Sequence, residues 1–163
     1  MAFEIREARP DEHAEAGRVT ALAYREFVPE GSDDWPGYLE RIADIAGRAD
    51  RTTILVAVAE GRILGSATLE LDSRVDPDRT LAEGEAHIRM LGVHPDARGR
   101  GIGKALMRAC IDLAAAANKR RLTLNTTQRM RAAQRMYESL AFDRNEDETM
   151  PGGFVLLSYS KQL

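Results

Sequence analysis

The sequence predicts a mixed α/β fold, in which a central mixed β-sheet is flanked by helices on both faces. Three observations support this prediction. Segments typical of strands alternate with segments of helical apolar spacing, two apolar runs are close enough to form a hairpin, and 163 residues fit one domain, residues 1–163. The expected order is strand, two helices, three strands, helix, strand, helix, strand, which indicates a mixed sheet.

The N-terminal half begins with an alternating segment that predicts a strand over residues 2–8. A helix is expected over 11–27, with Asp11 as its N-cap, and a second helix near 36–48. The segment between them is rich in Pro, Gly and Asp, which predicts a loop.

The middle of the chain predicts a β-hairpin and then a third strand. The β-branched run 52–58 and the apolar segment 63–71 are joined by Glu-Gly-Arg, which is typical of a tight turn. A polar loop leads to a strand over 85–93.

The C-terminal half predicts two helices and two strands. Strands are expected over 121–126 and 154–160, with a further strand near 142–148, and a last helix between 130 and 140. The first helix of this half has one strongly apolar face. That face consists of Ile102, Ala105, Leu106, Ala109, Cys110, Leu113 and Ala117.

The composition is typical of a soluble globular protein, with 44% hydrophobic and 30% charged residues. There is no apolar run of membrane-spanning length, no N-terminal signal-peptide pattern, and only one cysteine, so we expect a cytoplasmic protein without a disulfide. The three histidines have no metal-ligand spacing, so no metal is expected. A homodimer is the default expectation for the oligomeric state.

Charge is unevenly distributed along the chain. Residues 89–135 carry 11 Lys or Arg and only 2 Asp or Glu, whereas the remainder carries 12 and 24. The basic segment therefore favours an anionic ligand, although two solvated faces of opposite sign would give the same pattern. Nucleic-acid binding is not expected, because no nucleic-acid motif is present and the aromatic content is only 6%.

The stretch MLGVHPDARGRGIGKALM, residues 90–107, joins the strand over 85–93 to the apolar helix. Glycines just before a helix leave backbone N–H groups accessible, and these bind phosphates well. A Walker loop is excluded because Ala105 follows Gly103-Lys104, and the spacing of the glycines does not match a Rossmann fingerprint. Arg98 to Gly103 instead match the pattern R/Q-x-x-G-x-G/A.

This stretch and a second motif together resemble the GCN5-related N-acetyltransferases. The first resembles the acetyl-CoA motif of that family, and AAQRMYESLAF, residues 132–142, resembles its A-x-x-x-Y-x-x-x-G-F motif. The resemblance covers most of the chain and implies the family's fold and an acetyl-CoA-dependent N-acetyltransferase acting on an amine by direct transfer. A non-catalytic acyl-CoA sensor is the alternative.

The resemblance also implies which residues bind acetyl-CoA. The backbone of the strand before the loop would pair with the pantetheine arm, Gly92 would leave space for that arm, and Arg98 would order the loop. Asn125 is a candidate because Met130 replaces an Asn that contacts the cofactor in many members. The full set is Leu91, Gly92, Val93, Arg98, Gly99, Arg100, Gly101, Ile102, Gly103, Lys104 and Asn125.

Three side chains are candidates for catalysis. Acyl transfer to an amine needs a base, and we expect Glu85 to act through water, with His87 as the second candidate. The backbone N–H of Leu91 or Gly92 would stabilise the oxyanion. Tyr137 matches the family's general acid, although its place on an apolar stripe also fits a core aromatic.

Two further predictions concern departures from the family and the acceptor. Ala141 replaces the family's Gly after the last helix, which is costly if φ there is positive. Glu30, Asp33 and Asp34 make the loop between the first two helices acidic, which favours a cationic acceptor unless these residues are only solvated. Trp35 beside them fits either a wall of the acceptor pocket or a cap on the core.

Overall fold

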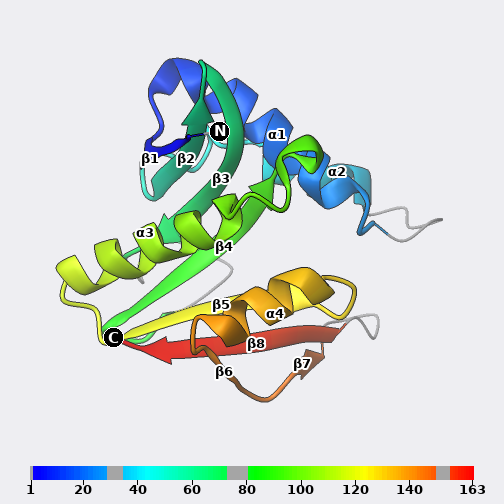
Figure 1. Cartoon of the computed structure of the whole chain (residues 1–163). Helices are drawn as coiled ribbons and strands as arrows, with labels where there is room; N and C mark the ends of the chain where they lie inside the picture. Colours follow the sequence, from blue (N-terminus) through cyan, green and yellow to red (C-terminus); the bar gives the residue numbers. More distant parts are fainter. Residues whose placement is uncertain (1, 29–34, 73–80, 150–154) are drawn as a thin grey trace.

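The computed structural model describes residues 2–28, 35–72, 81–149 and 155–163, which contain a mixed sheet with helices on both faces, as predicted. The sheet order is β1-β2-β3-β4-β5-β8-β6, with β7 paired to β8 (Figure 1). The strands are β1 (Glu4–Glu7), β2 (Thr53–Ala59), β3 (Arg62–Glu70), β4 (Glu85–Val93), β5 (Arg121–Thr127), β6 (Asp143–Arg144), β7 (Glu148–Thr149) and β8 (Val155–Gln162). The helices are α1 (His13–Arg25), α2 (Trp35–Ala43), α3 (Ile102–Ala116) and α4 (Arg131–Ser139). The strand expected near 142–148 is divided into β6 and β7.

The start of α1 differs from the prediction. A 3-10 turn over Pro10–Glu12 comes first and Glu12 is the N-cap of α1, so the assignment of Asp11 as N-cap is wrong. The carboxylate of Glu12 accepts hydrogen bonds from both terminal nitrogens of Arg6, at 2.7 and 2.8 Å, and from the backbone N–H of Arg9. These bonds fasten the turn to β1.

Helix α2 ends at Ala43, five residues before the predicted end. The buried Arg48 guanidinium donates to the carbonyl oxygens of Arg41, Ile42 and Asp44 at 2.9–3.0 Å, which satisfies the end of the helix. Ile45 is fully buried although it lies beyond the helix, so the apolar spacing continues past the end of α2.

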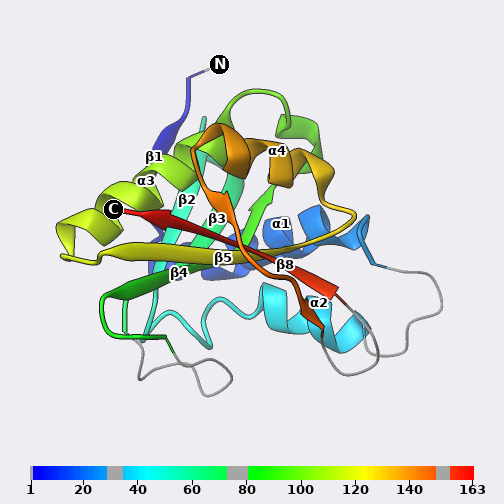
Figure 2. The same cartoon turned by 90° about the horizontal axis from the view of Figure 1, so that it is seen from below.

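The helices lie on both faces of the sheet (Figures 1 and 2), and two apolar clusters hold them there. Ala16 and Val19 of α1 pack with Ile54, Val56 and Ile63 on one face. The opposite face packs against α3 and α4, in a larger cluster. Its buried members include Leu55, Ala57, Leu69, Ala86, Ile88, Ile102, Leu106, Met107, Cys110, Leu122, Leu124, Tyr137, Phe142, Leu157 and Tyr159.

Strands β4 and β5 are parallel neighbours along only part of their length. The pairing runs from Glu85 and Arg121 to Ile88 and Leu124, and beyond this point the strands diverge (Figure 1). A bulge follows in β4, where the register with β3 shifts and Met90 has a φ of 54°. The divergence opens the sheet between α1, α3 and α4.

Candidate functional site

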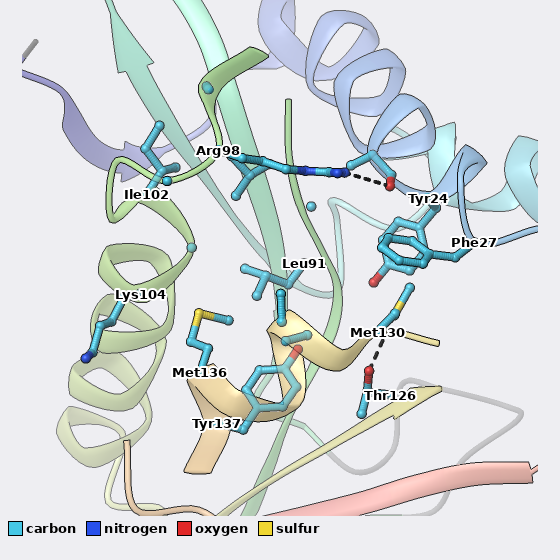
Figure 3. Close-up of a pocket in the computed structure, with 18 of the residues that line it drawn as sticks. Tyr24, Phe27, Leu91, Arg98, Ile102, Lys104, Thr126, Met130, Met136 and Tyr137 are labelled. Atoms are coloured by element: carbon cyan, nitrogen blue, oxygen red, sulfur yellow. Dashed lines mark hydrogen bonds between the residues drawn. The ribbon is translucent and has the colours of Figure 1, made fainter. Parts of the chain in front are cut away.

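A groove lies where β4 and β5 diverge. Its cavity has a volume of about 340 Å³, and its lining residues come from α1, β4, β5, α4 and the start of α3 (Figure 3). They are Ala23, Tyr24, Phe27, Leu91, Gly92, Val93, Ala97, Arg98, Gly99, Gly101, Ile102, Gly103, Lys104, Asn125, Thr126, Met130, Ala132, Ala133, Met136 and Tyr137. Ten of the eleven predicted cofactor residues are therefore brought together; Arg100 and the predicted bases are not among the lining residues.

The glycine-rich loop forms one end of this groove. Gly101 is the N-cap of α3 and has a φ of 80°, a left-handed conformation that glycine adopts without steric cost. The first N–H groups of a helix have no intrahelical partner, and the helix dipole makes this end positive. The loop therefore presents hydrogen-bond donors to the groove in a position suited to an anion.

The basic side chains of the loop have different positions. Arg98 donates to the carbonyl oxygen of Ala23 at 3.3 Å and forms an ion pair with Glu26, so it joins the loop to the end of α1. Lys104 lines the groove, but its amine points away from the tyrosines (Figure 3). Arg100 is exposed.

The segment Leu91–Val93 of β4 forms one wall of the groove. A Cβ on Gly92 would lie 3.0 Å from the Cβ of Ala23 and 3.4 Å from Thr20. The absent side chain therefore accommodates α1, whereas the sequence analysis assigned that space to the pantetheine arm. The backbone of Gly92 still lines the groove.

Tyr137 reaches the groove from α4. Its ring packs at a tilt against Phe142 and Tyr159, with centroids 6.2 and 5.7 Å away, so it is part of the core as well as the groove. Burial, followed by the proximity of Tyr159, raises the pKa of Tyr137 well above its usual value. The phenol is therefore protonated at neutral pH and can donate a hydrogen bond or a proton.

The turn after α4 holds Tyr137 in place. Ala141 has a φ of 63°, so the left-handed conformation is present although the residue is not glycine. The N–H of Phe142 donates to the carbonyl of Tyr137, and the N–H of Ala141 to that of Glu138, both at 3.0 Å. These two bonds form a Schellman motif.

The two predicted bases lie on β4 before the groove. His87 is 2% exposed, and its Nδ1 lies 2.7 Å from Thr123 Oγ1. Thr123 Oγ1 also donates to the carbonyl oxygen of Ala86 at 3.3 Å, so Thr123 connects the imidazole ring to the backbone of β4. Glu85 accepts from Arg121 at 2.6 Å and from the Ala82 N–H at 2.9 Å.

Asn125 and Met130 both line the groove, from β5 and from the N-cap of α4. Met130 Sδ accepts a hydrogen bond from Thr126 Oγ1 at 3.3 Å (Figure 3). Asn125 Nδ2 donates to Ser158 Oγ at 2.9 Å, and its buried Oδ1 has no partner among the described residues. Asn125 therefore presents an acceptor oxygen at the divergence of the strands.

The described residues include no group of three or more His, Cys, Asp or Glu placed to hold a metal ion. Cys110 is buried in the core, and burial raises the pKa of its thiol to about 12, so it is a poor nucleophile.

Among the helices of the described residues, none is both long and apolar enough to cross a membrane. Glu30, Asp33 and Asp34 lie outside the described residues.

The family model for the acetyltransferase (GNAT) family matches residues 18–142. The chain belongs to this family. The assignment made from the two sequence motifs is thus confirmed, and the matched range includes the glycine-rich loop, the groove and Tyr137.

Comparisons with individual GNAT proteins agree with this assignment. The chain is 39% identical over 100 residues to N-acetylaspartate synthetase of Danio rerio, a match that covers 60% of the chain and 33% of that longer relative. The putative acetyltransferase yncA of Salmonella typhimurium, solved with acetyl-CoA, has a TM-score of 0.72 at 20% identity, covering 99% of this chain and 94% of that one. The ribosomal-protein-S18-alanine N-acetyltransferase of Escherichia coli has a TM-score of 0.73 at 17% identity, with the same coverages.

Sequence reasoning missed several groove residues of this GNAT chain. Tyr24 of α1 and Phe27, just after the end of α1, line the cavity, and the hydroxyl of Tyr24 points into the same space as that of Tyr137 (Figure 3). Burial raises the pKa of Tyr24 well above its usual value, with a further contribution from the nearby Tyr137. Phe27 continues the apolar spacing of the predicted helix over 11–27 and Tyr24 belongs to no motif, so no local signal distinguished them.

Proposed function

We propose that this chain is an acetyl-CoA-dependent N-acetyltransferase that transfers acetyl directly to a primary amine in a ternary complex. The observation that carries the proposal is the groove at the β4–β5 divergence. One end is a glycine-rich helix N-terminus, and the wall contains a buried phenol. Acetyl-CoA would satisfy both features if its phosphates lay at the helix N-terminus and its thioester sulfur lay near the phenol.

The binding residues follow from this orientation. The pyrophosphate of acetyl-CoA would accept hydrogen bonds from the N–H groups of residues 99–104, where the helix dipole also favours negative charge. Arg98 holds that loop against α1 through Ala23 and Glu26. The pantetheine arm would pair with Leu91–Val93, since this part of β4 lies beyond its last pair with β5.

The reaction forms a C–N bond and breaks the C–S bond of the thioester. The amine nitrogen attacks the carbonyl carbon, and the N–H of Leu91 or Gly92 stabilises the oxyanion. Tyr137 then donates a proton to the departing thiolate, a role suited to a phenol that burial keeps protonated.

A base must accept the proton that the amine loses. His87 is the better placed candidate, because it lies nearer to the divergence than Glu85 and because one ring nitrogen of a neutral imidazole keeps a lone pair. Glu85 lies about 20 Å along β4 from Leu91, at roughly 3.3 Å per residue. Its carboxylate is also bonded to Arg121 and Ala82. We therefore assign proton removal to His87 through water.

The acceptor is an amine. The relatives are named for the acetylation of aspartate and of a ribosomal-protein alanine, so L-aspartate and a peptide with N-terminal alanine are the first acceptors to test. The prediction of a cationic acceptor depends on Glu30, Asp33 and Asp34, which lie outside the described residues, and stays a prediction.

The test is an assay of the purified protein with acetyl-CoA and a panel of amino acids, peptides, polyamines and aminoglycosides, following free thiol and N-acetylated product together. We expect equal amounts of both. Tyr137→Phe should lower kcat by about 10²- to 10⁴-fold, the usual range for a general acid. Tyr24→Phe is the matched control, since its hydroxyl lies in the same groove. Binding of acetyl-CoA without product from any amine would favour the sensor.

A further inference from the structure

One end of the groove is formed by apolar side chains that lie outside the protein core. Tyr24, Phe27 and Met130 line the cavity on the side away from Ile102 and Lys104 (Figure 3). Each of the three is half-buried, and none is a member of the two apolar clusters of the described residues. Their apolar surface therefore faces the cavity, where a ligand can cover it. We call Phe27, Met130 and the ring of Tyr24 the apolar end of the groove.

The middle of the groove differs from this end because its walls are part of the core packing. Leu91, Val93, Ala133 and Met136 line the cavity and pack against the larger apolar cluster. This is the part along which the pantetheine arm is proposed to lie. Tyr137 also belongs to that cluster, so a thioester sulfur beside its hydroxyl lies where the core-packed walls give way to the apolar end.

The thioester is therefore adjacent to the apolar end. The hydroxyl of Tyr24 points into the same space as that of Tyr137, and Phe27 and Met130 lie beyond it on the side of α1 (Figure 3). Because the sulfur, the carbonyl carbon and the rest of the acyl group follow one another along the donor, a chain longer than acetyl would continue from Tyr137 toward Phe27 and Met130.

Met130 is suited to contact with such a chain. Its Sδ accepts a hydrogen bond from Thr126 Oγ1 at 3.3 Å, so the sulfur already has a donor within the protein. The rest of the side chain is methylene and methyl groups. A methionine side chain is unbranched and has three rotatable bonds, so it adapts its shape to an irregular apolar neighbour.

Charge in the groove also favours an alkyl chain at this end. The charged side chains among the described lining residues are Arg98 and Lys104. Arg98 is bonded to Ala23 and paired with Glu26, and the amine of Lys104 points away from the tyrosines (Figure 3). A charged group of an acceptor would lose its hydration against the carbon atoms of the apolar end, which is costly. An alkyl chain contains no polar atom and incurs no such cost.

We infer that this transferase accepts acyl groups longer than acetyl, and that the alkyl chain of a propionyl or butyryl thioester contacts Phe27 and Met130. This inference rests on the proposed function and extends its acyl donors beyond acetyl-CoA. The amine nitrogen forms a bond to the acyl carbon and the C–S bond breaks. Tyr137 protonates the sulfur, and the proton lost by nitrogen passes through water to His87. The products are CoA and the N-propionyl or N-butyryl amine.

The experiment compares acetyl-, propionyl- and butyryl-CoA with one amine that the wild type acylates, following free thiol and N-acylated product. Each methylene removed from water strengthens binding by about fourfold. KM for the donor should therefore fall by about fourfold from acetyl- to propionyl-CoA and by a similar factor to butyryl-CoA. The value of kcat should change little, since the chain is bound equally in the ground state and the transition state.

Two substitutions of Phe27 should change this preference in opposite directions. Phe27→Trp places a larger ring at the apolar end and should abolish the advantage of butyryl-CoA over acetyl-CoA. Phe27→Ala enlarges that end and should extend the preference to hexanoyl-CoA. Phe27 lies outside both apolar clusters, and its N–H donates to the carbonyl of Tyr24 at 3.0 Å, a backbone bond that both variants keep.

Two further variants keep the test decisive. Met130→Phe fills the same end from α4 and should act as Phe27→Trp does, which covers the case in which a variant of Phe27 fails to fold. Leu113→Ala is the matched control, because it shortens an apolar side chain that is 38% exposed on α3 and does not line the groove. It should keep the wild-type order of the three donors.

The outcomes separate this inference from the proposed function. If the wild type uses acetyl-CoA at least as well as the longer donors, the inference is wrong and the proposed function stands. The same conclusion follows if the variants keep the advantage of butyryl-CoA, or if they change KM for the amine in place of KM for the donor.

If no amine is acylated, calorimetry of acetyl- and butyryl-CoA binding replaces the kinetic assay. Tighter binding of butyryl-CoA that Phe27→Trp abolishes would support the apolar end and contradict the transferase. Equal binding of the two thioesters, or an advantage of butyryl-CoA that the variant retains, would overturn both.

Discussion

Replacing Ala141 with glycine should stabilise the protein, because this residue follows α4 in a left-handed conformation with φ of 63°. Its side chain is exposed, so the substitution removes no core contact. The left-handed region costs a non-glycine residue about 1–2 kcal/mol. The glycine variant loses about 0.5–1 kcal/mol of stability, because glycine increases the conformational entropy of the unfolded chain. The net gain in the free energy of unfolding is thus about 0.5–1 kcal/mol.

Thermal and urea unfolding of Ala141→Gly measure this gain. At about 2–4 °C per kcal/mol for a chain of this size, Tm should rise by roughly 1–4 °C. Acetyl transfer at 25 °C should be unchanged, because the bonds from the N–H groups of residues 141 and 142 to the carbonyls of Glu138 and Tyr137 are backbone bonds that glycine also makes.

The matched control is Ala115→Gly, an exposed alanine in the last turn of α3. There the backbone is helical, so the same substitution should destabilise the protein by about 0.5–1 kcal/mol. The reasoning would be refuted if Ala141→Gly were as destabilising as this control, since the strain attributed to residue 141 would then be absent.

Three other predictions concern the groove and the N-terminus. Gly101→Ala should raise KM for acetyl-CoA and lower stability by about 1–2 kcal/mol, since φ is 80° at this N-cap; unchanged KM would contradict the role of the loop. The Cys110 thiol should resist alkylation by iodoacetamide at pH 8 in the folded protein and react in urea, because burial raises its pKa to about 12; rapid labelling without urea would be inconsistent with its burial. The hydrogen bond from Arg6, followed by that from the Arg9 N–H, lowers the pKa of Glu12 from 4.5 to about 2. Its contribution to stability is thus complete above pH 4.5 and lost as pH falls through 2. In a plot of the unfolding midpoint against pH, Glu12→Gln should therefore reduce the fall at acidic pH. A fall as steep as that of the wild type would show that Glu12 contributes little.

Much of the fold could be predicted because it depends on local patterns. The strand predicted over 85–93 has those bounds as β4, since its apolar run is delimited by a polar loop and by Pro95. Helix α2 was predicted too long because Ile45 is buried at helical spacing after the helix has ended. The carbonyl oxygens at the end of α2 are satisfied by the side chain of Arg48, a hydrogen-bonding effect that apolar periodicity does not contain.

The part of the groove that the glycine-rich loop forms could be predicted for the same reason. The loop and the adjoining parts of β4 and α3 are contiguous in sequence, so their spacing indicates their chemistry. The bulge at Met90 gave no signal, because methionine has no preference for a positive φ. The rest of the groove combines Tyr24, Asn125 and Tyr137 from three separate elements, and only the fold brings them together.

The most direct test of the central claim is a single-turnover experiment that follows acetyl-CoA, the protein and the amine together. With L-aspartate or another accepted amine, intact-mass and product analysis should show one N-acetylated amine for each CoA released and no acetylated form of the protein at any time. Direct transfer at the β4–β5 divergence predicts that CoA is not released when the amine is absent. An acetylated protein that forms without the amine and later passes its acetyl group to it would contradict the ternary-complex mechanism.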